Sequence, residues 1–320
     1  MIRKKIKISY CLPLLALLLL PLSVLVPALS HAELEYPFTF LDDRKREITL
    51  AVAPKRIISI GPANTEIIFA IGAEQLLVGV DRYSDYPEAA KQITRIGGLL
   101  SPSFDKIVAL NPDLVILGAS THPEIMDKLV ALNVPVATIL PENLDEIYQR
   151  IGLFGQICDK SAKAEQVIRQ MKGRVKRVRE VIDAIPKSER KSVFYEVWYD
   201  PLQSAGPGSF IHDIIELGGG INIAGDAKTA WPLFSLETLI VRNPEVIFTT
   251  RKKSVTELLE GHRKAWNRIS AVEAKRVYQL NGNEISRPGP RVVRALEAIA
   301  QALYPKQFKE KTETGNKGTK

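Results

Sequence analysis

Aromatic side chains occur in this sequence where predicted strands end. Tyr83 follows shortly after a buried, strand-like segment. Trp198 and Tyr199 directly follow a second one, and Trp231 precedes a proline in a predicted loop. Ligands of open parallel sheets bind outside the carboxyl ends of the strands, so aromatic residues at these places would line a broad, mostly apolar cleft. The chemistry they suggest is binding of a flat ligand.

Two carboxylates stand at matching places in the two halves of the chain. Ser103 and Ser235 can each cap a helix, and Asp105 and Glu237 follow two residues later, in the first helical turn. Taken singly, each acid is explained by capping and by the helix dipole. As a pair of exposed acids, one in each half, they fit a docking surface for a two-fold symmetric partner that supplies arginines.

The motifs of common catalytic and metal sites are missing from the sequence. It contains no Walker phosphate loop and no G-x-G-x-x-G, G-x-S-x-G, H-E-x-x-H or C-x-x-C pattern. The histidines that follow residue 32 are His122, His212 and His262, and none is spaced to share a metal with another. We therefore expect no catalytic residue and no metal site, and a secreted hydrolase is the least favoured alternative.

The first 32 residues have the character of an export signal. Basic residues between positions 3 and 7 precede a mostly apolar segment over 11–29, and Ser30-His31-Ala32 offers a small-x-small cleavage site. A retained membrane anchor is the alternative, but three prolines interrupt the apolar segment. The bulky Tyr10 before Cys11 does not fit a lipoprotein signal. We expect a periplasmic protein that begins at Glu33.

The charge balance argues against nucleic acid as a partner. The signal takes four of the 44 basic residues, which leaves 40 against 36 acidic residues and a net charge of about +4. Residues 306–320 contain five lysines and two glutamates, so the tail carries three of these four charges. The remaining body is almost neutral and lacks the concentrated basic face that nucleic-acid binding needs.

Strands and helices alternate in two series, which predicts two lobes with parallel sheets, an α/β fold. The first series has expected strands at 56–60, 76–81, 114–117 and 134–139, and helices at 64–71, 103–110, 123–132 and 143–156. The second has expected strands at 192–197, 246–249 and 277–280, and helices at 209–217, 235–241 and 290–304. A leader over 35–54 is expected to add one edge strand.

Residues 161–185 have apolar side chains three and four positions apart, which predicts one amphipathic helix about 37 Å long. A single stiff helix between the lobes predicts a ligand cleft that opens only slightly. The expected organisation is a signal peptide over 1–32, a first lobe over 33–158, the linking helix over 159–188, a second lobe over 189–305 and a basic tail over 306–320.

The two lobes look like distant copies of one another. Residues 104–116 match residues 236–248 at a constant offset, and an Asn-Pro-acid sequence falls in register in both. The matched length favours duplication over the chance recurrence of a common helix–turn–strand unit. Duplication would place Asp105 and Glu237 at equivalent positions.

Several segments, in order along the chain, resemble the periplasmic cobalamin and ferric-siderophore receptors of ABC importers. They lie at 55–66, 83–87 and 107–113 in the first lobe and at 230–237 and 287–291 in the second, and the resemblance extends from about residue 56 to 304. It implies a monomeric, non-enzymatic receptor that delivers a small molecule to a dimeric membrane permease.

The cobalamin-binding member of that family is the most similar. Tyr83 and Trp231 match its ligand-stacking aromatic residues, and Asn283 falls where it has an acid near the ligand. Asp105 and Glu237 match the acids that dock on arginines of the two membrane subunits. The resemblance therefore implies one ligand site and one docking surface.

The sequence departs from this pattern at two aromatic positions. Leu99 stands where the cobalamin receptor has a tryptophan, and Val197, next to Trp198, where it has a phenylalanine. Cobalamin or a related corrinoid is the expected ligand, because corrinoids carry their own axial ligands and need few protein groups. Haem would need a protein ligand such as Tyr83, and a ferric siderophore basic residues such as Arg287. No cofactor other than the transported ligand is expected.

Overall fold

The computed structural model describes residues 35–118 and 123–309 of the chain. The expected signal peptide, His122 and positions 310–320 of the expected tail lie outside these ranges. Within them, no helix combines the length and the apolar character needed to cross a membrane.

The first lobe contains a parallel sheet with the strand order β4-β3-β5-β6. Its strands are β3 (Ile57–Ile60), β4 (Leu77–Val80), β5 (Leu114–Leu117) and β6 (Val136–Thr138). Its helices are α1 (Pro62–Ala70), α2 (Phe104–Ala109), α3 (Pro123–Ala131) and α4 (Leu144–Ile157). Alternate side chains of β5 enter two separate hydrophobic cores, so both faces of the sheet are buried. Helices α1 and α4 cover one face, and α2 and α3 cover the other.

The second lobe has a parallel sheet with the order β10-β7-β11-β12. Its strands are β7 (Ser192–Glu196), β10 (Ile221–Asn222), β11 (Val246–Thr249) and β12 (Val277–Gln279). Its helices are α6 (Phe210–Leu217), α7 (Leu236–Arg242), α8 (Lys252–Leu259), α9 (Ser270–Glu273), α10 (Gly282–Ile285) and α11 (Val292–Leu303). Helices α6 and α11 pack on one face of this sheet, and α7 and α8 on the other.

The two sheets share one strand order: in each lobe the second strand lies on one side of the first, and the third on the other. The matched segments become α2–β5 in one lobe and α7–β11 in the other. Asn111 and Asn243 both adopt the left-handed conformation, with φ of 42° and 40°. Asp113 accepts hydrogen bonds from backbone amides just before β3, and Glu245 accepts one from the first residue of β7. The repeated Asn-Pro-acid sequence thus ends a helix and anchors the central strand.

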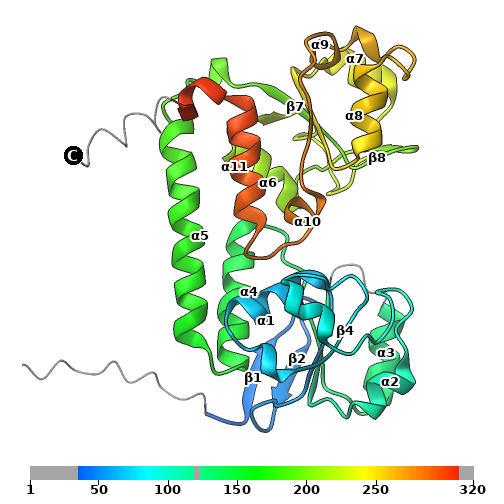
Figure 1. Cartoon of the computed structure of the whole chain (residues 1–320), viewed down its shortest axis with the longest axis vertical. Helices are drawn as coiled ribbons and strands as arrows, with labels where there is room; N and C mark the ends of the chain where they lie inside the picture. Colours follow the sequence, from blue (N-terminus) through cyan, green and yellow to red (C-terminus); the bar gives the residue numbers. More distant parts are fainter. Residues whose placement is uncertain (1–34, 119–122, 310–320) are drawn as a thin grey trace, which may run out of the picture. The chain divides into compact units, whose positions relative to one another are not determined.

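Helix α5 (Ser161–Ile182) connects the lobes and runs beside α4 and α11 (Figure 1). Its buried residues recur every three or four positions, which gives one apolar stripe along a helix about 33 Å long. Arg174 in α5 forms an ion pair with Glu297 in α11, which fastens α5 to the second lobe. The expected architecture of two parallel-sheet α/β lobes joined by one long helix is confirmed.

Two short hairpins differ from the expected elements. The leader forms two antiparallel strands, β1 (Phe38–Leu41) and β2 (Glu47–Leu50), so the expectation of one edge strand was wrong. Trp198 and Tyr199 form a two-residue strand, β8, which pairs with β9 (Leu202–Gln203). The expected leader strand corresponds to β2, whereas β1, β8 and β9 were not predicted, because strands of two to four residues carry too little alternation of polar and apolar residues to be read reliably.

A buried carboxylate of the first lobe is shared by two arginines of the second. Glu66 in α1 is 3% exposed. It accepts hydrogen bonds from Arg287 at 2.9 Å and from Arg291 at 2.6 and 2.7 Å. Arg287 also donates to Asp85 at 2.8 Å. We call Glu66, Asp85, Arg287 and Arg291 the inter-lobe cluster, because its ion pairs join the two lobes directly.

The inter-lobe cluster responds to pH through Asp85. Burial by itself would raise the pKa of Asp85, but the hydrogen bond and the positive charge of Arg287 hold that pKa below its usual value of 3.8. A carboxyl group with a lowered folded-state pKa stabilises the fold above its usual pKa, and this contribution disappears as the pH falls through the folded-state value. The Asp85 contact should therefore be intact at neutral pH and weaken only below about pH 4.

Replacing Glu66 by Ala is expected to lower the free energy of unfolding by about 3 kcal/mol, because it leaves Arg291 without a carboxylate partner in a mostly buried place. Urea denaturation of the wild type and of the variant measures this difference. Glu88→Ala, which removes an exposed pair with Lys91, is the control and should change stability little. Equal effects of the two substitutions would contradict a structural role for the inter-lobe cluster.

Candidate functional site

A cavity of about 240 Å³ lies between the lobes, beside the carboxyl ends of β3 and β5. These two strands are neighbours, but the chain continues from β3 to β4 on one side and from β5 to β6 on the other. In open α/β folds, ligands bind at the carboxyl ends of two strands that diverge in this way. The cavity is lined from both lobes by residues that include Asn64, Tyr83, Leu99, Asn283, Ser286 and Arg287.

Two glycines make room for this cavity in the first lobe. Gly61 follows β3 and Gly118 follows β5. A Cβ atom on Gly61 would lie 3.0 Å from the Cα of Gly118 and 3.2 Å from the side-chain nitrogen of Asn64. Any larger residue would crowd the floor of the cavity, so the small size of both residues keeps the strand ends close and accessible.

The loop that carries Tyr83 is held in place by buried polar groups. Asp81, which is fully buried, accepts hydrogen bonds from the backbone of Gly61 at 3.0 Å, the backbone of Tyr83 at 2.7 Å and the hydroxyl of Ser84 at 2.6 Å. Arg95 donates to the carbonyl oxygens of Asp81 and Ser84, both at 2.8 Å. Tyr83 therefore stands on a rigid loop while 51% of its surface stays exposed.

Trp198 and Trp231 lie on one face of a small β ribbon in the second lobe. Gln203 pairs with Trp198 on one side and with Leu233 on the other, and its side-chain amide donates to the carbonyl of Trp231. Opposite residues of antiparallel strands, and residues two apart in one strand, share a face. Trp198 and Trp231, 50% and 44% exposed, and the exposed Leu233 therefore lie on this face, where the guanidinium group of Arg251 lies over the Trp198 ring at 4.0 Å.

Tyr199 points to the other face of this ribbon. Its ring lies over the guanidinium group of Arg263 at 3.8 Å and near the ring of Trp266. Arg263 is itself buried and forms an ion pair with the fully buried Glu196 at the end of β7. The structure therefore places Tyr199 as the cover of a buried charge and not beside Trp198.

The structure brings four of the seven expected ligand residues together around the cavity: Tyr83, Leu99, Asn283 and Arg287. Trp198 and Trp231 form the ribbon surface, and Tyr199 is turned away from it. Arg287 differs most from its expected role, because its guanidinium already contacts Glu66, Asp85 and the carbonyl of Tyr83.

Asn64, Ser286 and Arg263 were not singled out from the sequence. Asn64 had a readable signal, since it opens a helix directly after a buried strand and a Gly-Pro pair. Arg263 had none, because its partner Glu196 is 67 residues away and no local pattern connects them.

The proposed docking acids stand at equivalent helix starts. Asp105 and Glu237 are exposed in the first turns of α2 and α7, and the preceding serines cap both helices. One turn further, an exposed valine follows each acid on the same helical face: Val108 in α2 and Val241 in α7. Each lobe thus presents an acid beside an apolar side chain.

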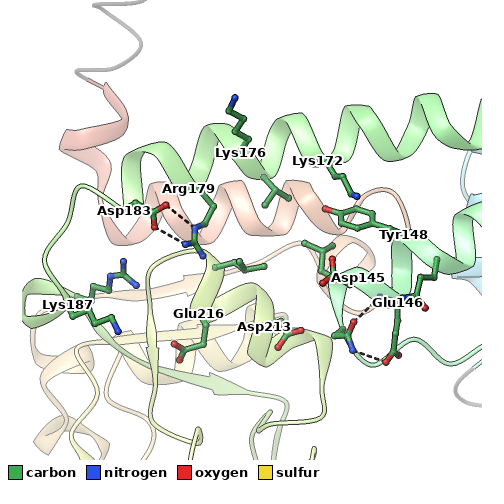
Figure 2. Close-up of a pocket in the computed structure, with 16 residues that line it drawn as sticks. Asp145, Glu146, Tyr148, Lys172, Lys176, Arg179, Asp183, Lys187, Asp213 and Glu216 are labelled. Carbon is green, nitrogen blue, oxygen red and sulfur yellow. Dashed lines mark hydrogen bonds and ion pairs between the residues drawn. The ribbon is translucent and has the colours of Figure 1, made fainter.

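A larger hollow of about 1430 Å³ lies along α4, α5 and α6 (Figure 2). Lys172 and Lys176 line it from α5, and Asp213 and Glu216 from α6. Tyr148 lies under Lys172, and burial raises the pKa of its hydroxyl to about 12. Charged groups of both signs dominate these walls, unlike the mostly apolar walls of pockets that hold small ligands. The inter-lobe cavity is therefore the better candidate site.

The inter-lobe cavity offers groups that can bind a ligand. Its walls present aromatic and aliphatic surface, amide groups and one arginine. Among the described residues that line it, the titratable side chains are Tyr83 and Arg287, and these two form no nucleophile–base pair. Across residues 35–118 and 123–309, no group of three or more His, Cys, Asp or Glu residues could hold a metal ion.

Comparisons with known proteins agree with this fold. An ABC transporter substrate-binding lipoprotein of Bacillus subtilis, YvrC, is 32% identical over 86% of this chain and 88% of its own. The vitamin B12-binding protein BtuF of Vibrio cholerae is 30% identical, with a TM-score of 0.68 over 78% of this chain and 97% of that one. The haem-binding protein RhuT of a Roseiflexus species is 29% identical, with a TM-score of 0.69 over 79% and 99%. The model of the family described as periplasmic binding protein matches residues 57–284, and the chain belongs to this family of solute-binding proteins of ABC importers.

Proposed function

We propose that this protein binds cobalamin or a related corrinoid between its lobes and delivers it to the permease of an ABC importer. The observation that carries the proposal is the set of exposed aromatic side chains, Tyr83 on the first lobe and Trp198 and Trp231 on the second. The similarity to the vitamin B12-binding protein of Vibrio cholerae supports the same ligand.

Exposed aromatic side chains suit a flat macrocyclic ligand. Contiguous apolar surface is costly on a soluble protein and commonly marks an interaction site. Trp and Tyr rings offer a large contact area with few rotatable bonds, so little conformational entropy is lost when a ligand stacks on them. A corrinoid brings its own axial ligands to the metal, and therefore needs such walls more than it needs a protein ligand.

Haem is the second candidate ligand, and a ferric siderophore the third. Tyr83 favours haem, because the phenol oxygen of this half-exposed residue could coordinate the iron, and RhuT is a haem-binding protein of similar sequence. Arg287 would favour an anionic siderophore, but its contacts with Glu66 and Asp85 already use much of its charge. Calorimetry and absorption spectra with cyanocobalamin, haemin and ferric siderophores separate the three.

Delivery to the permease would use Asp105 and Glu237. Equivalent acids on two duplicated lobes can pair with identical arginines on two symmetric membrane subunits. Val108 and Val241 would add apolar contact beside each ion pair. The proposal includes export through a signal peptide over residues 1–32, cleavage before Glu33, and action as a periplasmic monomer.

Replacing Tyr83 or Trp231 by Ala is expected to weaken cyanocobalamin binding by about 1–3 kcal/mol each, because each substitution removes a stacking surface. Isothermal calorimetry measures the affinity, and thermal unfolding checks that the fold is kept. Leu41→Ala, an exposed apolar residue on β1, is the control and should bind normally. Normal affinity combined with early unfolding of both aromatic variants would assign these rings to the core instead.

Replacing both Asp105 and Glu237 by Lys is expected to abolish uptake and to leave ligand affinity unchanged, because like charges would then meet on the permease. Transport of the ligand into vesicles that contain the permease measures uptake. Uptake by the wild type should depend on the salt concentration, because salt screens attraction between exposed charges over about 8–10 Å.

The matched control for this charge reversal is Glu124→Lys with Glu273→Lys. These two acids are also exposed and also lie in the first turns of helices, α3 and α9. Both double variants change the net charge by the same amount, and Glu124→Lys also reproduces the loss of a first-turn acid from a longer helix. Normal uptake by the Asp105→Lys, Glu237→Lys protein would rule out docking through these acids.

A further inference from the structure

We propose that the inter-lobe cavity is a subsite for one acyl side chain of the ligand, a carboxamide or a carboxylate whose oxygen accepts hydrogen bonds from Asn64 and from the start of α1. This inference rests on the proposed function and deepens it. The flat ring of the ligand would lie on the exposed aromatic side chains, and one side chain at the edge of that ring would enter the cavity.

The size of the cavity fits a limb of a ligand and not a whole one. Pockets that enclose a complete small molecule have volumes of about 300–1,000 Å³, and a corrinoid or haem lies toward the upper end of that range or beyond it. The volume here is about 240 Å³. Tyr83 lines this cavity and is also 51% exposed, so a ring that stacks on it can send a side chain inward.

Asn64 supplies an unused donor inside this cavity. Only 2% of its surface is exposed, and it lines the cavity floor. In the part of the chain that the structure describes, its side-chain nitrogen has no hydrogen-bond partner. Leaving a buried amide unpaired is unfavourable, because the group loses its hydrogen bonds to water, so an unpaired amide at a cavity wall is a reason to expect a bound acceptor there.

The start of α1 adds backbone donors to the same place. This nine-residue helix begins at Pro62, has no acidic residue in its first turn and has no side-chain cap. The amides of Ala63 and Asn64 therefore point out of the helix without an intrahelical partner. Ala63 and Asn64 both line the cavity, and the positive end of the helix dipole favours an oxygen that carries negative charge.

The wall of the cavity that the second lobe provides carries an arginine and, among the described residues, no acidic side chain. Arg287 lines the cavity from the second lobe. One of its terminal nitrogens donates to Glu66 and Asp85, and the other donates to the carbonyl of Tyr83. A guanidinium group has five N–H bonds, so two remain for a ligand oxygen. Glu66 and Asp85 use much of the charge of Arg287, but they do not line the cavity, so no acidic side chain among its described lining residues would repel a ligand oxygen.

An acyl oxygen is the chemistry shared by the candidate ligands. Corrinoids carry acetamide and propionamide side chains around the ring, and haem carries propionates. A neutral carboxamide would use Asn64 and the α1 amides, whereas a carboxylate would also be drawn by Arg287 and by the helix dipole. The two sources differ in charge, and they can therefore be separated by experiment.

The test uses propionamide and propionate as probes of the whole mature protein, labelled with nitrogen-15. We expect saturable shifts of the side-chain amide of Asn64 and of the backbone amides of Ala63 and Asn64 with at least one probe. The side-chain amide of Asn267, which is exposed in the second lobe, should not shift. If neither probe gives saturable shifts at Asn64, the subsite is overturned, whatever macrocycle the protein binds.

The same inference predicts the behaviour of two variants toward cyanocobalamin and haemin. Asn64→Leu removes the donor, and Asn64→Asp keeps the shape but offers an acceptor, so each should lower affinity about tenfold, as the loss of one hydrogen bond implies. Asn267→Leu should bind as the wild type does. Normal affinity of both Asn64 variants overturns the subsite while the proposed function stands. Failure of the wild type to bind either macrocycle refutes the proposed ligand class, while the fragment shifts still decide the subsite.

Discussion

The arrangement of the two lobes around the cleft depends on the ion pairs that the buried carboxylate of Glu66 forms with Arg287 and Arg291. Glu66 is almost fully buried, and removing a charge from water is expensive unless partners replace the lost hydration. Arg287 and Arg291 provide that replacement from the other lobe, so Glu66 is satisfied only when the lobes stand as they do here. Helix α5 limits how far the lobes can separate, and the inter-lobe cluster sets how they meet.

Arg287 connects this contact to the ligand site, because it belongs to the inter-lobe cluster and also lines the cavity. A ligand oxygen that attracts Arg287 would compete with Asp85, which is the more exposed of its two acidic partners. Binding and the contact between the lobes would then be linked through one guanidinium group. Such a link offers a physical route by which the bound state could differ from the empty one at the permease.

The two lobes contribute different things to the proposed site. The first lobe provides a rigid floor, in which Asp81 fixes the loop of Tyr83 and two glycines leave room beside Asn64. The second lobe provides aromatic surface on a short ribbon that Gln203 holds together. The proposed docking acids lie at the starts of α2 and α7, which occupy equivalent places in the two lobes.

The sequence by itself determined the architecture, because long periodic signals report burial directly. The buried strands Leu114–Leu117 and Val246–Thr249 were predicted with their observed bounds, and the long helix ends three residues earlier than expected. It also selected Tyr83, Leu99, Asn283 and Arg287, all of which line the cavity. Tyr83 was found from its place after a strand end, whereas Leu99 and Asn283 were found only by their match to the cobalamin receptor, and Arg287 belongs to a segment of family resemblance.

Tertiary structure alone decided what these residues touch. Arg287 lies 221 residues from Glu66, and no local pattern reports a pair so distant. Trp198 and Tyr199 are adjacent in sequence, yet strand alternation sends one ring to an exposed surface and the other onto the buried Arg263. The sequence marks Asn64 as part of a helix start, but only the packing of Gly61 against Gly118 leaves its amide at a cavity wall. Such facts depend on the register of distant strands and on the balance of buried charges, which a linear pattern of residues does not contain.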